Sequence, residues 1–183
     1  MTDVLEKTSL RLSSRRIHGR AVNAVAELLR RHLSVPEIYL EPRILGIAST
    51  DVLAVDRAGS GDLHAVEVKA ITEFLSRSQL KSLLTQVKSI PFHFKYLALP
   101  SYASNLSDPH LRFAEYPELF DESGLGRVGI ISFDPKILQA STVIDESSVV
   151  LTVRPERFRV RSEKLAAIER FLVKAKPDIS VRL

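Results

Sequence analysis

The sequence predicts an α/β domain in which a mixed central β-sheet is flanked by helices. Three observations predict this class. We expect an amphipathic helix at residues 15–33, two apolar strands joined by a polar turn at residues 51–69, and a second helix followed by an apolar strand at residues 72–99. Helices and strands in this order are typical of a sheet covered on both faces, and the hairpin makes part of that sheet antiparallel.

Length and composition indicate one soluble globular domain, residues 1–183, because the chain is 45% hydrophobic and 26% charged. The absence of cysteine excludes disulfides, thiolate metal sites and a cysteine nucleophile. No apolar run approaches the roughly 20 residues that cross a bilayer, and the N-terminus lacks a secretory apolar segment. We therefore expect a cytoplasmic protein with no membrane contact. The formal net charge of +4 is compatible with a polyanionic partner.

The N-terminal part of the chain begins with a weakly patterned segment. Residues 1–12 are polar, and we expect them to be partly disordered. The first helix follows at residues 15–33, where apolar side chains recur at helical spacing. Residues 37–47 have the pattern of a strand, but Pro42 inside it indicates an edge position or a bulge.

The hairpin at residues 51–69 contains two β-branched and aliphatic runs around a turn at residues 58–62. If the turn centres near Gly59, antiparallel pairing places the first residue of the hairpin opposite its last three, with Cβ atoms roughly 5 Å apart. The carboxylates of Asp51 and Glu67 are then close enough to share a divalent cation. Both faces of the two strands are largely apolar, which predicts a central pair covered on two sides.

The remaining elements are predicted from the same two periodicities. They are a helix at 72–89, a strand at 93–99, a helical or irregular stretch at 104–120, strands at 127–133, 149–153 and 157–160, and a last helix at 163–174.

Two short motifs at the end of the hairpin away from its turn resemble a known pattern. Ser49-Thr50-Asp51 opens the first strand and Glu67-Val68-Lys69 closes the second. Together they resemble the PD-(D/E)XK nuclease superfamily, which has the restriction-endonuclease-like fold, although the proline of the first motif is absent here. The resemblance covers residues 15–100, including the helix before the hairpin and the helix and strand after it. It implies a metal-dependent endonuclease that hydrolyses DNA.

The resemblance also implies roles for individual residues. Asp51, Glu67 and the Val68 carbonyl would hold Mg²⁺ or Mn²⁺, because hard oxygen ligands favour these ions over zinc. The bound ion would polarise the phosphate and acidify a water molecule. Lys69 would act as a cation that orients water and phosphate, because two neighbouring carboxylates favour its ammonium form over the neutral base.

Two further positions follow from the superfamily pattern. Many relatives have a glutamate on the inner face of the first helix, for which Asn23 and Glu27 are both candidates; Glu27 would otherwise pair with Arg30 or Arg31 on the helix surface. A glutamine on the helix after the hairpin often faces the active site, and Gln86 is our candidate, with a flanking position without a role as the alternative.

Arginines form two groups that could follow a phosphate backbone. One group comprises Arg157, Arg159 and Arg161, and the other Arg11, Arg15, Arg16 and Arg20. A solvated strand face explains the first group equally well. Two functions therefore remain: a metal-dependent DNA endonuclease, or a catalytically inactive module of the same fold for nucleic-acid binding or protein interaction. A homodimer would suit cleavage of both strands of a duplex, since two sites would face two phosphodiesters.

Overall fold

The computed structural model describes residues 2–34, 36–44, 47–57, 61–70, 77–101, 127–140 and 149–180. Within these ranges the side chains of residues 2–14, 48, 77, 139–140 and 180 are not described. The expected stretch at 104–120 lies outside the described residues. No helix in the described ranges is both long enough and apolar enough to cross a membrane.

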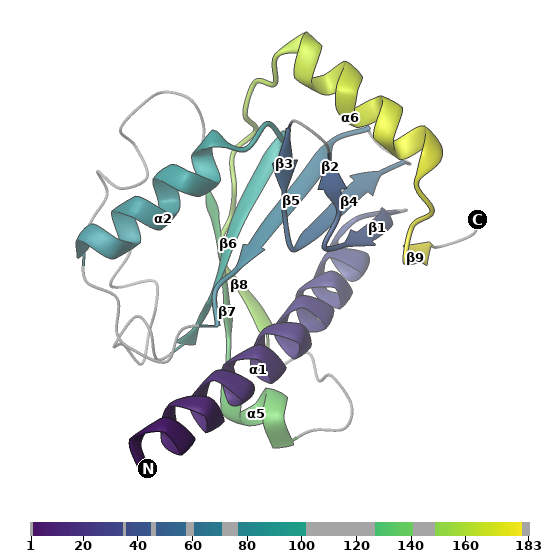
Figure 1. Cartoon of the computed structure of the whole chain (residues 1–183). Helices are drawn as coiled ribbons and strands as arrows, with labels where there is room; N and C mark the ends of the chain where they lie inside the picture. Colours follow the sequence, from purple (N-terminus) through teal and green to yellow (C-terminus); the bar gives the residue numbers. More distant parts are fainter. Residues whose placement is uncertain are drawn as a thin grey trace.

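In the described part of the chain, seven strands form one mixed sheet in the order β8-β7-β6-β5-β4-β1-β9 (Figure 1). The strands are β1 (Pro36–Leu40), β4 (Val52–Asp56), β5 (Leu63–Val68), β6 (Phe94–Pro100), β7 (Gly129–Phe133), β8 (Val149–Val153) and β9 (Ile179–Ser180). β5, β6 and β7 are parallel to one another, and the other neighbours are antiparallel. The predicted mixed sheet is therefore confirmed.

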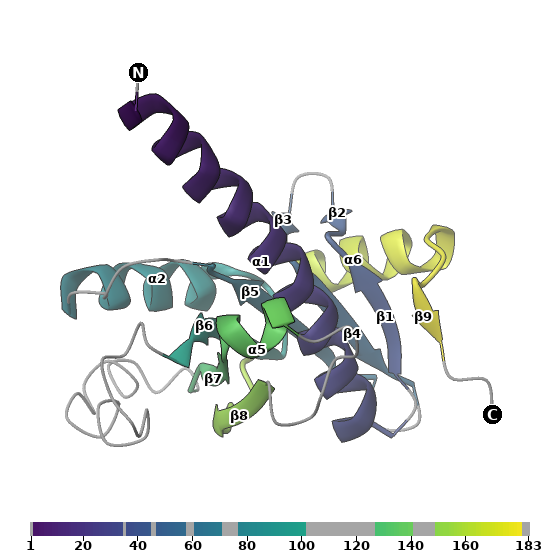
Figure 2. The same ribbon diagram turned by 90° about the horizontal axis from the view of Figure 1, so that it is seen from below.

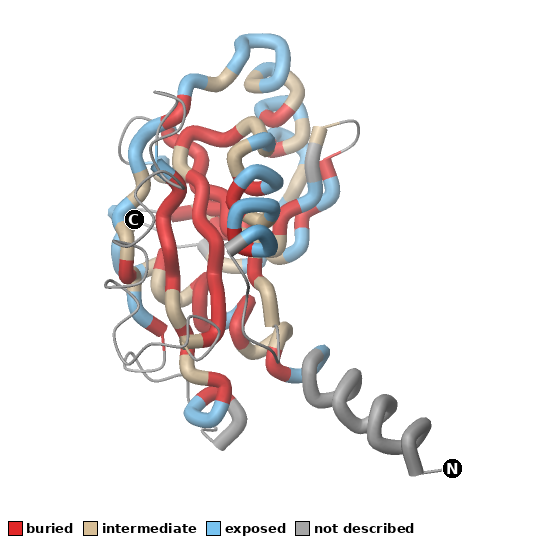
Figure 3. The backbone as a smooth tube through the Cα atoms, turned by 90° about the vertical axis from the view of Figure 1, so that its left-hand side faces the viewer, coloured by how far each residue is buried: buried red, intermediate tan, exposed pale blue. Residues whose placement is uncertain are grey.

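Helices cover both faces of this sheet (Figures 1 and 2). The helices are α1 (Thr2–His32), α2 (Arg77–Ser89), α5 (Pro135–Ala140) and α6 (Ser162–Lys174). α1 and α5 pack on one face, where Val25 and Leu138 share a cluster with Val66. α2 and α6 pack on the other face, against β6 and against the β4–β5 pair respectively. Figure 3 shows the buried residues concentrated in the strands between these helices.

The hairpin has the predicted register and the predicted double cover. Val52 pairs with Val66 and Val55 with Leu63. Even-numbered side chains such as Val66 pack under α1, and odd-numbered ones such as Ala65 pack under α6. All of these side chains are buried. The near-continuous apolar runs of the two strands thus correctly predicted a strand pair covered on both faces.

Several elements differ from the expectation. The strand expected at 37–47 divides at Pro42 into β1 and a separate two-stranded sheet of β2 (Arg43–Ile44) and β3 (Ala48–Ser49). Glu41, at the division, has a φ of 46°. Residues 157–160 are not a strand, although Phe158 is buried and its amide donates to the His93 carbonyl at 2.7 Å. α1 extends to Thr2, and α5 and β9 were not expected, because all three are too short or too polar to show a clear period.

A buried histidine near the turn end of the sheet leads to a first prediction. His64 stacks on Phe94 with ring centroids 4.6 Å apart, and its Nδ1 lies 3.0 Å from the Tyr96 hydroxyl. Burial lowers the pKa of His64 to about 4. The folded protein therefore binds fewer protons than the unfolded chain between about pH 6.5 and pH 4, and acidification across this window should remove about 3 kcal/mol of stability.

The matched variant is His64→Phe combined with Tyr96→Phe, which removes both hydrogen-bonding partners and keeps the stack. Chemical denaturation from pH 7 to pH 4 should show the double variant losing less stability than the wild type. Equal losses in the two proteins would contradict a titrating His64.

Candidate functional site at the end of β5

The hairpin brings Asp51, Glu67 and Lys69 together at the end of β5. The β4–β5 ladder ends at the Val52–Val66 pair, and one step further places Asp51 level with Glu67. The Asp51 amide donates to the Val66 carbonyl at 3.1 Å, and the Lys69 amide donates to the Ala98 carbonyl at 2.9 Å. The backbone on both sides of the two carboxylates is therefore fixed by the sheet.

Thr50 anchors the turn that precedes Asp51. Its side chain is buried, and its hydroxyl donates to the Val66 carbonyl at 2.8 Å. This hydrogen bond restrains the entry into β4 directly before Asp51.

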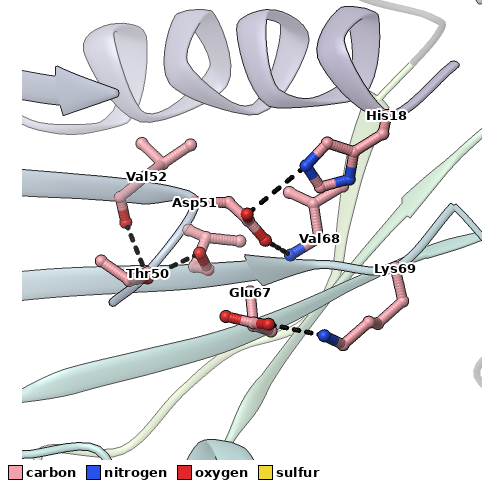
Figure 4. Close-up of polar contacts among 8 residues, drawn as sticks. His18, Thr50, Asp51, Val52, Glu67, Val68 and Lys69 are labelled. Carbon is pink, nitrogen blue, oxygen red and sulfur yellow. Dashed lines mark hydrogen bonds and ion pairs between the residues drawn. The ribbon is translucent and has the colours of Figure 1, made fainter. Parts of the chain in front are cut away.

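The Asp51 carboxylate lies between α1 and the end of β5 (Figure 4). Oδ2 accepts the Val68 amide at 2.6 Å, and Oδ1 lies 3.4 Å from Nε2 of His18 on α1. Burial raises the pKa of the Asp51 carboxyl, the Val68 amide opposes this, and the negative charge of Glu67 raises the pKa further. Asp51 therefore ionises at a cost that a nearby cation would reduce.

Glu67 and Lys69 form an ion pair. Lys69 Nζ lies 2.6 Å from Glu67 Oε1, and both side chains are mostly buried. Glu67 is level with Leu97, which packs under α2, so its side chain leaves β5 on the α2 face. The two carboxylates thus flank the end of β5, with Asp51 toward α1 and Glu67 beside Lys69 (Figure 4).

A pocket of about 550 Å³ opens beside these residues, between α1 and the end of β5. Its lining consists of Arg15, His18, Gly19, Glu41, Val68, Lys69 and Ala70. Lys69 therefore belongs both to the ion pair with Glu67 and to the pocket wall. Ligand pockets typically have volumes of about 300 to 1,000 Å³.

The first helix contributes a histidine instead of an acid. Asn23 is exposed. Glu27 accepts hydrogen bonds from Arg30 at 2.8 and 2.5 Å and from Arg31 at 3.1 Å, so the structure supports the surface pairing expected as the alternative. The residue of α1 that approaches Asp51 is His18, which lies about one and a half turns before Asn23 and two and a half turns before Glu27. The sequence offered no signal for this, because no other histidine lies at metal-ligand spacing from His18.

Gln86 is not brought to the three hairpin residues. β5 and β6 are parallel, so α2 runs back from the end of β5 toward the start of β6. Gln86 is exposed and lies three residues before the end of α2, near the start of β6, whereas Lys69 follows the end of β5. The glutamine expected to face the site therefore lies on the solvent side of α2.

The two arginine groups have different surroundings. Arg157 donates to Asp62, with Nε 3.0 Å from Oδ1, while Arg159 and Arg161 are exposed. In the other group, Arg15 lines the pocket and Arg20 donates to the Leu138 carbonyl. The side chain of Arg11 lies outside the described residues. Of the described arginines in these two groups, Arg15 is the one that lines the pocket at the end of β5.

Among the described residues, no three His, Asp or Glu side chains are arranged to hold a metal ion. Mg²⁺, however, is commonly bound through one or two carboxylates together with water and substrate phosphates. Asp51 and Glu67 each supply a carboxylate at the end of β5, Asp51 toward α1 and Glu67 on the α2 face. Searches of protein-family models, curated proteins and solved structures found no match to this chain.

Proposed function

We propose that the protein is a metal-dependent endonuclease that hydrolyses phosphodiester bonds of DNA. One observation carries the proposal: Asp51 is level with Glu67 at the end of β5, next to Lys69 and beside a pocket open to solvent. The order of elements also supports it. Three antiparallel strands, β1, β4 and β5, are followed by α2 and the parallel strand β6, as expected for a restriction-endonuclease-like core.

The residues at the end of β5 have distinct roles in this proposal. Asp51, Glu67 and the Val68 carbonyl would hold Mg²⁺ or Mn²⁺. When bound, the ion supplies charge neutralisation at the phosphate and a lowered pKa for water. Lys69, which pairs with Glu67, would orient the phosphate and the attacking water. Thr50 and the sheet hold Asp51 in place, so little reorganisation is needed when the substrate arrives.

A catalytically inactive module of the same fold is the second candidate, and a specific observation favours it. Each carboxylate already has a partner within the protein: the Val68 amide for Asp51 and the Lys69 ammonium for Glu67. Both carboxylates therefore have hydrogen-bond partners when no cation is bound. The module would then bind nucleic acid or protein through the same surface without cleaving it.

A nicking assay distinguishes the two candidates. Supercoiled plasmid would be incubated with wild-type protein and with Glu67→Ala or Lys69→Ala, in Mg²⁺, in Mn²⁺ and in EDTA. The enzyme should nick plasmid only with metal, and each variant should lose at least about 100-fold in rate. Glu163→Ala and Lys164→Ala on α6, where both residues are exposed, are matched controls and should retain the wild-type rate.

The opposite result is equally clear. The same weak activity in the wild type, the two site variants and the EDTA samples would indicate a contaminating nuclease and favour the inactive module. Labelled DNA and RNA oligonucleotides of one sequence, tested side by side, would establish which nucleic acid is the substrate.

A further inference from the structure

The pocket between α1 and the end of β5 has features that the nuclease motif does not explain. Its wall includes Arg15 and Lys69, and also His18, whose Nε2 lies 3.4 Å from Asp51 Oδ1. The rest of the lining is small or aliphatic apart from Glu41, and the one aromatic ring among these lining residues is the His18 imidazole, which already contacts Asp51. A cationic side chain beside exposed helix backbone suits a sugar–phosphate group.

Gly19 is the least expected residue of the lining. It lies inside the 31-residue helix α1, where glycine is less stable than alanine because it has more freedom to lose. A Cβ built at Gly19 would meet no atom within 4 Å. Close packing within the described residues therefore does not require glycine here. What the missing side chain does provide is a bare stretch of helix backbone in the pocket wall.

Glu41 is held in an unusual conformation in the same wall. Its φ of 46° is disfavoured for a residue with a side chain. The amide of Glu41 donates to the Asp51 carbonyl at 2.8 Å, which ties this turn to the candidate site. Strained residues of this kind cluster at functional sites. Two independent backbone features thus mark the pocket.

We propose that the pocket is a subsite for a second phosphate of the nucleic acid, adjacent to the one that is hydrolysed. Arg15 binds this phosphate, and the bare backbone at Gly19 lets the strand approach α1 closely. The inference rests on the proposed function and names which part of the substrate the chain recognises. The phosphate is either an internal phosphodiester or a terminal monoester, since both present the same anionic oxygens.

Binding of a labelled oligonucleotide to the full chain tests the subsite, and a Glu67→Ala background prevents cleavage during the measurement. Arg15→Ala should weaken binding about 10-fold and lower the slope of log K against log salt by about one. Arg16→Ala is the matched control, because Arg16 is exposed on the same turn but is not part of the lining, and it should change binding less than 2-fold. Equal losses in the two variants would overturn the subsite in favour of a diffuse basic surface.

Gly19 provides a test that separates binding from stability. Gly19→Ala should raise the melting temperature by about 2 °C, because alanine favours the helix, yet weaken binding. Gly19→Leu should weaken binding at least about 10-fold by filling the pocket. Wild-type binding by Gly19→Leu would overturn the proposal.

Oligonucleotides with different ends distinguish a terminal phosphate monoester from an internal phosphodiester. A terminal monoester predicts about 10-fold tighter binding of a 5′- or 3′-phosphorylated strand than of its hydroxyl form, with the preference lost in Arg15→Ala. An internal phosphodiester predicts that a circular single strand binds as well as either linear form.

Failure of the subsite differs from failure of the proposed function. Metal-dependent cleavage that survives unchanged in Arg15→Ala and Gly19→Leu overturns the subsite alone. Binding that depends on Arg15 and Gly19, in a protein that never cleaves, keeps the subsite and rejects the nuclease.

Discussion

Asp51→Asn is expected to abolish metal-dependent cleavage while leaving the protein at least as stable as the wild type. The asparagine oxygen can still accept the Val68 amide, which the aspartate binds at 2.6 Å. The substitution removes a carboxyl group whose pKa is raised by burial and by the negative charge of Glu67. Ionisation of this carboxyl group therefore opposes folding at neutral pH. A residue that is retained against stability is typical of a functional site. We expect a loss of at least about 100-fold in nicking rate.

Asp51→Ala provides the contrast. It removes the charge and also leaves the Val68 amide without its acceptor, which should cost about 2 kcal/mol. Urea denaturation of the three proteins at pH 7 should therefore rank asparagine at or above aspartate, and alanine below both. If Asp51→Asn were clearly less stable than the wild type, the carboxylate would have a structural role, and its loss of cleavage would say little about catalysis.

Lys95→Met is expected to stabilise the protein by about 2 kcal/mol at pH 7. Lys95 is 5% exposed, and its burial lowers the pKa of the amine to about 8. Burying the ammonium therefore costs about 3 kcal/mol relative to the unfolded chain. The ammonium lies 4.0 Å from the centre of the Phe158 ring and donates to the Lys88 carbonyl. These two contacts stabilise the folded protein by about 1 kcal/mol, and the methionine cannot form them.

The pH dependence identifies the cause. A base whose pKa is lower in the folded protein makes stability rise with pH, here between about pH 8 and pH 10.5. The advantage of Lys95→Met in chemical denaturation should be constant below pH 8 and shrink steadily above it. An advantage that stays the same at pH 10 would indicate better packing by the methionine instead of removal of a buried charge.

The hairpin was the part of the fold that the sequence predicted best. Its two strands are apolar on both faces and pair in the predicted register, which places Asp51 level with Glu67. The split of the segment before the hairpin, residues 37–47, was only partly predicted. Pro42 indicated a break, but the left-handed turn at Glu41 was not predictable, because its backbone is held by a hydrogen bond to Asp51, a distant partner in the sequence.

Sequence patterns could not predict the pocket, for a related reason. Arg15, His18 and Gly19 lie on a helix whose periodicity predicts which side faces the sheet but not how far the helix has slid along it. That position depends on packing of Ala21 and Val25 against Val66 and other strand residues. Gln86 illustrates the same limit. The sequence predicted which side of α2 carries Gln86. Its distance from the end of β5 depends on where α2 begins, and the sequence did not predict that.

The 2.6 Å contact between Lys69 and Glu67 has a consequence for the order in which ligands bind. A phosphate that draws the ammonium toward the pocket leaves Glu67 with an uncompensated negative charge, and this strengthens its attraction for a divalent ion. By reciprocity, an ion on Glu67 frees Lys69 for the phosphate by the same factor. Nucleic acid and metal should therefore bind with positive cooperativity, so that neither alone assembles a competent centre.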